Sequence, residues 1–228
     1  MTTTAALNEL KKFADPSHLK NYERFGIEAR NPIGVRVPNI KKVAKSIGRN
    51  HGLAVQLMKE SIHEAKLLAP LIAEKQRMTR EEMDDWVRGF YSWDLVDNSC
   101  RFLVSTPFGL EKSSEYRKSD NEFEIRTGLV MLVAYALHEK QASEEHLNSL
   151  LSAAVKCASD DRVYVKKAVS WLIRTIGKKS IFLHKQALKT AEQLEFVPVR
   201  SAQWIARDVQ HELTSAKVLG RIQQKNPA

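Results

Sequence analysis

The stretch FYSWDLVDNSC, residues 90–100, shows the spacing that recurs through the whole chain, because its apolar side chains return every three or four residues, as on one face of an α-helix. Such a helix places on a common face Trp93, Val96, Asp97, Cys100 and Val104. Asp97 does not suit an apolar face, because burying a carboxylate is costly unless it is paired or used. We interpret Asp97 either as a structural acid that pairs with an arginine or caps another helix, or as a functional group. The neighbouring Asp94 is expected to be structural.

Helical spacing continues on both sides of this stretch. Glycine and proline are scarce, at 9 and 7 of 228 residues, and no segment alternates apolar and polar residues as a strand would. Breakers separate the helical segments, and residues typical of helix starts follow them. The start signals are Asp15-Pro16-Ser17, Thr79 with Glu82, Ser119-Asp120-Asn121, Ser143 and Ser159-Asp160-Asp161.

Short helices joined by short connections favour one class of architecture. We predict an all-α fold, a curved solenoid of HEAT-like antiparallel helix pairs (an α-α superhelix), with a degenerate repeat of about 40 residues. No linker or low-complexity segment divides the chain. The simplest organisation is a single domain over residues 1–228 that ends in a short polar tail, RIQQKNPA (221–228).

The charge balance points to a polyanionic partner. The chain has 36 Lys and Arg against 27 Asp and Glu, a formal charge of +9, and its pI is near 9.5. Nucleic acid is the first expectation for such a partner and an anionic membrane surface the second. The alternative is a basic protein whose charge serves only solubility.

Other function classes are disfavoured. Cys100 and Cys157 form no CxxC motif and no Cys/His cluster, so we expect neither a disulfide framework nor a metal site. This cysteine content fits a protein of a reducing compartment. The longest uncharged run, residues 127–138, is shorter than the roughly 20 residues that a membrane-spanning helix needs. No address signal is visible, so we expect a cytoplasmic protein of bacterial type.

A second helical stretch, SDNEFEIRTGLVMLVAYALHE (119–139), also carries a charge at the start of an apolar stripe. The stripe consists of Arg126, Leu129, Val130, Val133 and Leu137. Arg126 is then either the partner of Asp97 in a buried ion pair or a guanidinium directed at a phosphate.

A third stretch, DDRVYVKKAVSWLIRTIGKKS (160–180), sets a tryptophan among cations. One stripe of this helix holds Tyr164, Ala168, Trp171, Leu172 and Thr175, and the adjacent stripe holds Lys167, Trp171, Arg174 and Lys178. This pattern suits contact with a sugar–phosphate backbone, because the ring packs and the cations neutralise charge. The alternative is a core tryptophan beside a solvated basic face.

Taken together, three segments resemble the AlkD-like DNA alkylation repair glycosylases in order and spacing. They are SWDLVD (92–97), SDNEFEIRTGLVML (119–132) and VYVKKAVSWLIRTIGK (163–178). GVRVPNIKKVAKSIG (34–48) resembles the N-terminal turn and helix of that family, and IHEAKLLAPLIAE (62–74) resembles its recurrent His-Glu helix. The resemblance covers roughly residues 20 to 213.

The resemblance implies a specific activity. The family releases positively charged N3- and N7-alkylated purines from duplex DNA without flipping the base, and it contacts the deoxyribose of the lesion. Carried over by motif, Asp97 is the catalytic carboxylate, and Trp93 and Trp171 pack against the sugar–phosphate backbone of the lesion. Arg126 holds a phosphate or the aspartate. A cationic base leaves without a general acid, and a fixed carboxylate stabilises the oxocarbenium-like sugar.

The expected partner is therefore double-stranded DNA that contains alkylated bases, bound by a monomer without a metal or other cofactor. Candidate backbone-binding cations are Lys41, Lys42, Lys45, Lys166, Lys167, Arg174 and Lys178. The alternatives are a non-catalytic binder of damaged or branched DNA and a protein-interaction scaffold.

The chain departs from the family pattern at two positions: Ser92 precedes Trp93 where some relatives have a second aromatic residue, and Phe123 stands where relatives often carry Trp. Either Tyr22 or Phe25 is the aromatic residue that the family places in its N-terminal helix. His63 is expected to cap or bridge neighbouring repeats; acid–base work is the less favoured alternative.

Overall fold

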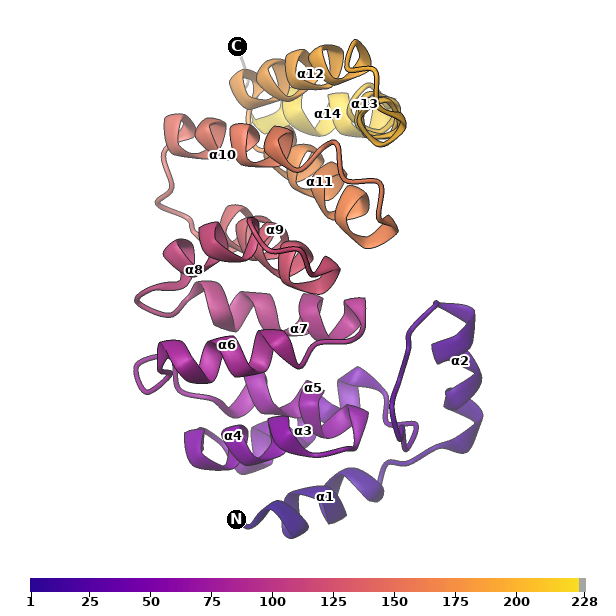
Figure 1. Ribbon diagram of the computed structural model, residues 1–228, viewed down its shortest axis with the longest axis vertical. Coiled ribbons are helices and arrows are strands. Elements are labelled where there is room, and N and C mark those ends of the chain that lie inside the picture. Colours follow the sequence, from indigo (N-terminus) through magenta and orange to yellow (C-terminus); the bar gives the residue numbers. More distant parts are fainter. Residues whose placement is uncertain (226–228) are drawn as a thin grey trace. The chain divides into compact units, whose positions relative to one another are not determined.

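The computed structural model describes residues 1–225 and is helical, with no β-strand in that range, which confirms the predicted all-α class (Figure 1). A short 3-10 turn, η1 (Pro16–His18), lies between the first two helices. The α-helices are α1 (Thr3–Lys11), α2 (Leu19–Arg24), α3 (Val37–Ile47), α4 (His51–Lys59), α5 (His63–Ile72), α6 (Arg80–Arg88), α7 (Trp93–Val104), α8 (Gly109–Tyr116), α9 (Glu122–His138), α10 (Glu144–Lys156), α11 (Val163–Ile176), α12 (Ile181–Glu195), α13 (Arg200–Leu213) and α14 (Ala216–Lys225).

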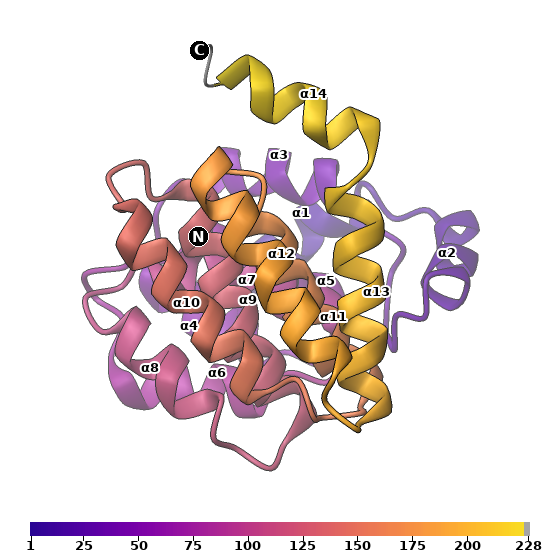
Figure 2. The same cartoon turned by 90° about the horizontal axis from the view of Figure 1, so that it is seen from above.

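The chain divides into two compact units, residues 1–109 (unit 1) and residues 110 onward (unit 2). In unit 1, α4 packs on α5, and α5 packs in turn on α3 and α7. In unit 2, α9 packs on α11, α11 on α13, and α12 lies beside α13 (Figure 2). Each unit thus repeats one packing arrangement: consecutive helices pair, and the pairs stack, as expected for a HEAT-like fold.

Several helices begin where the sequence predicts. Thr79 and Glu82 form a reciprocal capping box at the start of α6. The side chains of Asn121 and Ser143 accept hydrogen bonds from the first turns of α9 and α10. The expected start at residues 159–161 differs, because α11 begins at Val163 without a side-chain cap.

The polar tail is partly helical. Residues 221–225 continue α14, and the remaining three residues of the predicted tail, 226–228, lie outside the described residues. The prediction of a single domain over the whole chain stays a prediction.

Two predicted stripes need correction. Helix α7 buries Leu95, Val96, Ser99, Cys100 and Leu103, while Trp93, Asp97 and Val104 are partly exposed. The prediction that Asp97 shares the buried face is therefore wrong, since the buried arc is turned by about one residue, which is about 100° on a helix. On α9 the predicted stripe fails at Leu137, which is 49% exposed, whereas Ile125–Ala134 are buried all around the helix.

Candidate functional site

The first residue of α7, Trp93, forms one wall of a small hollow in unit 1. Its ring N–H donates to the backbone oxygen of Gly26 at 3.2 Å. The hollow has a volume of about 160 Å³, and its lining includes Trp93, Asn98, Tyr22 and Phe25. Both candidate N-terminal aromatics therefore reach this place. Tyr22 is buried, whereas Phe25 is 59% exposed and offers an open aromatic surface.

Two aspartates of α7 have different surroundings. Asp94 is 6% exposed; one oxygen of its carboxylate lies 2.8 Å from Nε2 of His63, and the other accepts a hydrogen bond from the Ser92 hydroxyl. Asp97 is only partly buried and lies one turn after Trp93 on the same side of the helix. Asp94 is thus the structural acid of α7, and Asp97 is the carboxylate nearer to solvent.

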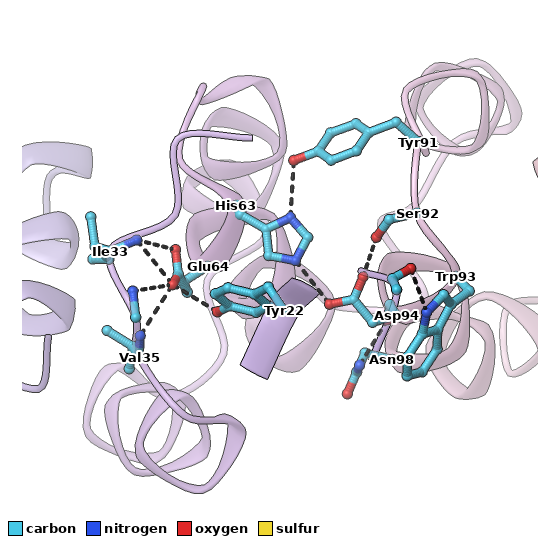
Figure 3. A network of polar contacts seen from close by, with 12 residues as sticks. Tyr22, Ile33, Val35, His63, Glu64, Tyr91, Ser92, Trp93, Asp94 and Asn98 are labelled. Carbon is cyan, nitrogen blue, oxygen red and sulfur yellow. Dashed lines mark hydrogen bonds and ion pairs between the residues drawn. The ribbon is translucent and has the colours of Figure 1, made fainter. Parts of the chain in front are cut away.

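His63 links α5 to the start of α7, as Figure 3 shows. Its Nδ1 lies 3.0 Å from the Tyr91 hydroxyl and its Nε2 contacts Asp94. Burial raises the pKa of Tyr91 to about 12, so the neutral phenol can donate to Nδ1 and leave the proton on Nε2 for Asp94. These contacts confirm the bridging role predicted for His63.

The next residue, Glu64, binds the segment that follows α2 (Figure 3). Its carboxylate accepts hydrogen bonds from three consecutive backbone N–H groups, those of Ile33, Gly34 and Val35, at 2.7–3.1 Å. It also accepts one from the Tyr22 hydroxyl at 2.9 Å. Burial raises the pKa of Tyr22 and the Glu64 charge raises it further, so the Tyr22 hydroxyl stays protonated and donates.

Two basic hollows of unit 1 are linked to the aromatic one through shared lining residues. A hollow of about 510 Å³ shares Asn98 with the Trp93 hollow and shares Arg49 and Leu71 with a third hollow of about 330 Å³. The cations that line the two larger hollows, named here the basic groove, are Lys41, Lys45, Arg49, Lys75 and Arg101. No acidic side chain is among their described lining residues. This track favours an anionic, elongated ligand.

The basic groove includes residues that sequence reasoning missed. Lys41 and Lys45 were predicted, and Lys42 is exposed but does not line either hollow. Arg49, Lys75 and Arg101 were not predicted, because they are far apart in sequence and meet only through packing. Arg49 also donates to the carbonyl oxygens of Leu71 and Ala73, at the end of α5, which fixes its guanidinium in place.

In unit 2, Arg126 joins α9 to the start of α11. It is 6% exposed, and its guanidinium donates to the backbone oxygen of Tyr164 at 2.8 Å. Glu122 accepts from the Tyr164 backbone N–H at 2.9 Å, and the Phe123 ring stacks on the Tyr164 ring at 5.5 Å. Arg126 is therefore largely buried against α11, a contact that neither sequence interpretation included.

Two of the predicted DNA-binding cations pair with acids of α13. Arg174 contacts Asp208 at 3.3 Å, and both Arg174 and Lys178 bind the Glu212 carboxylate. Burial raises the pKa of Glu212, but the hydrogen bonds from Lys178 and Arg174 outweigh this and lower it overall. The charges of Arg174 and Lys178 are thus partly offset inside the protein.

The remaining cations of α11 differ in their surroundings. Lys166 lies over the ring of Trp204 from α13, with its ammonium 5.5 Å from the ring centre. Lys167 is exposed, and Trp171 is partly exposed on the adjacent part of the helix. The predicted pattern of a tryptophan beside a basic residue therefore reaches the surface at Trp171 and Lys167.

Two further properties bear on function. Within residues 1–225, no three His, Cys, Asp or Glu side chains gather closely enough to hold a metal ion. Over the same residues, no helix has the length and apolar character needed to cross a membrane.

Comparison with known proteins identifies the family. A solved protein is described as one of "a new family of proteins related to the HEAT-like repeat DNA glycosylases with affinity for branched DNA structures"; it shares 19% identity and a TM-score of 0.77, over 97% of this chain and 96% of its own. This likeness shows the fold. A designed armadillo repeat protein is 14% identical with a TM-score of 0.38, over 91% of this chain and 99% of its own. A comparison of this chain with curated protein sequences found no match. The family described as DNA alkylation repair enzyme matches residues 6–203, and the chain belongs to that family.

Proposed function

We propose that the chain is a DNA glycosylase that releases positively charged N3- and N7-alkylated purines from duplex DNA without flipping the base. One observation carries the proposal. On the partly exposed side of α7, Asp97 lies one turn after Trp93, which lines the aromatic hollow, and Asn98 lines both this hollow and the basic groove. In this proposal the protein works as a monomer in the cytoplasm and needs no cofactor.

The proposed chemistry assigns different tasks to the residues of α7. An alkylated purine already carries positive charge, so cleavage of its bond to the sugar leaves cationic character on the deoxyribose. The Asp97 carboxylate stabilises this charge and orients the attacking water. Asp94 cannot take this task, because both of its oxygens are engaged by His63 and Ser92. The Trp93 ring, held by Gly26, packs against the sugar.

The proposed DNA contacts extend beyond the reacting sugar. The basic groove neutralises phosphates of the DNA backbone, Trp171 packs against the sugar–phosphate chain, and Lys167 adds charge beside it. Arg126 supports this surface through the start of α11. Each phosphate neutralised by the groove makes log affinity fall by about 0.9 per unit of log salt for duplex DNA.

A second candidate function is non-catalytic binding of branched DNA. It is favoured by the description of the solved protein of similar fold, whose family is said to have affinity for branched DNA structures. The basic groove suits this function equally, because phosphate contacts carry no information about the lesion. The two functions differ in whether a base is released.

The deciding experiment incubates the protein with methylated duplex DNA and quantifies free N3-methyladenine and N7-methylguanine. A reaction without protein corrects for spontaneous depurination. Asp97→Asn is expected to abolish release above this background. Asp85→Asn is the matched control, because Asp85 is an exposed acid of α6 paired with Arg88, and this variant should retain release.

Two results would redirect the assignment. Equal release by Asp97→Asn and the wild-type protein would remove Asp97 from the reaction. No release by the wild-type protein, together with salt-dependent binding to a four-way junction and to the same duplex, would favour the non-catalytic function.

A further inference from the structure

The first two residues of α5, His63 and Glu64, are both fully buried, although both have polar side chains. They point in different directions, as Figure 3 shows: His63 toward α7 and Glu64 toward the segment of residues 25–36. Burying a polar group costs free energy of folding unless the group is hydrogen-bonded, so we looked for what the contacts of these two side chains hold in place. The proposed chemistry uses neither residue.

The contact through His63 holds the backbone of Trp93. Nε2 of His63 binds the carboxylate of Asp94, the residue directly after Trp93. The carbonyl oxygen of Asp94 accepts a hydrogen bond from the Asn98 amide at 2.7 Å, within the same helix. The contact between His63 and Asp94 therefore ties the first turn of α7 to α5.

The contact through Glu64 holds the ring of Trp93. Glu64 fixes Ile33–Val35 through their backbone N–H groups, and the backbone N–H of His63 donates to the backbone oxygen of Arg30 at 3.1 Å. These bonds anchor the segment of residues 25–36 on α5. At the other end of this segment, the Gly26 oxygen accepts the hydrogen bond from the Trp93 ring.

We propose that His63 and Glu64 are positioning residues for Trp93, one acting through Asp94 and the other through the segment that carries Gly26. The pair sets where the indole lies relative to Asp97 and to the hollow beside it. Its catalytic consequence rests on the proposed function, whereas the placement of the ring does not. A ring fixed before DNA binds needs no rearrangement during the reaction.

The placement is tested by fluorine NMR of protein labelled with 5-fluorotryptophan. The chain has four tryptophans, and Trp93→Phe assigns the resonance of Trp93. Glu64→Gln is expected to shift or broaden this resonance, because the amide cannot accept from all of the bound N–H groups. The resonances of Trp171 and Trp204 should stay in place, which also shows that the variant is folded.

The matched control is Glu82→Gln, which makes the same change at another carboxylate of unit 1 that accepts a backbone N–H. Glu82 contacts His51 at 3.1 Å and caps α6 through Thr79, so its partners lie outside α7 and outside the segment of residues 25–36. It should leave the Trp93 resonance in place. Tyr22→Phe, which removes only one hydrogen bond to Glu64, should move that resonance less than Glu64→Gln does.

The catalytic consequence is measured as the single-turnover rate of base release. Glu64→Gln should lower this rate by about tenfold or more while DNA affinity stays unchanged. Displacing a catalytic group by about 1 Å can lower a reaction rate by up to about 100-fold. An unchanged Trp93 resonance in folded Glu64→Gln protein would overturn the proposal. If the wild-type protein releases no base, the proposed function fails, and the NMR comparison alone still decides the positioning role.

Discussion

The two aspartates of α7 allow a direct test of which one is structural. Asp94→Asn removes the charge from a carboxylate that is 6% exposed and lies 2.8 Å from His63 Nε2. Asp97→Asn makes the same chemical change three residues later, at a partly exposed position. The same helix and the same substitution remove differences in helix propensity from the comparison.

The expected magnitudes follow from burial. A hydrogen bond to a charged, buried group contributes about 1.5–3 kcal/mol, and the asparagine can keep only part of the contacts with His63 and Ser92. We expect Asp94→Asn to lower the free energy of unfolding by about 2 kcal/mol, which lowers Tm by roughly 4–8 °C in a protein of this size. Asp97→Asn should cost less than about 1 kcal/mol, because even an ion pair at a partly exposed site contributes little.

The assay is thermal unfolding followed by circular dichroism, run beside the base-release measurement on the same preparations. We expect opposite orders for the two variants: Asp94→Asn loses more stability, and Asp97→Asn loses more activity. Wild-type Tm in Asp94→Asn protein, with a large loss in Asp97→Asn protein, would refute the assignment of Asp94 as the buried acid.

Two further predictions concern other parts of the chain. Because the folded-state pKa of Glu212 is lowered, its ion pairs stabilise the protein above the unfolded pKa of about 4.3, and this stability is lost as pH falls through the folded pKa. Glu212→Gln should therefore lower Tm near neutral pH, with the difference from wild type vanishing on acidification; a difference that persists at about pH 2 would contradict this. Gly34 has φ +81° and an added Cβ would lie 2.2 Å from the Asp15 oxygen, so Gly34→Ala should destabilise by about 2 kcal/mol or more. Gly48→Ala, at a similar φ of +73° but in open space, should cost less in urea unfolding; equal losses would show that the backbone angle alone is responsible.

Part of the candidate site follows from sequence, because motif residues lie close together along one helix. The spacing of Trp93 and Asp97 places them one turn apart wherever α7 packs. The proposed catalytic role of Asp97, the phosphate contacts and the contribution of Trp171 and Arg126 stay predictions. The rotation of α7 was wrongly predicted, since the apolar residues on both sides of Val96 allow two arcs, and packing on α5 selects the arc centred on Leu95, Val96 and Ser99.

The sequence by itself determined the helical class and many helix boundaries. Thr79, Asn121 and Ser143 cap helices through bonds to residues two or three positions away, so the information is local.

Only the tertiary structure decided which charges are available to a ligand. The charge of Arg174 is partly neutralised by Glu212, which lies 38 residues later in the sequence. The basic groove instead collects cations from α3, α7 and the turns after α3 and α5. The physical reason is range: a cap is satisfied within one turn, but an ion pair or a groove forms only when packing brings distant helices together, and no local pattern encodes that distance.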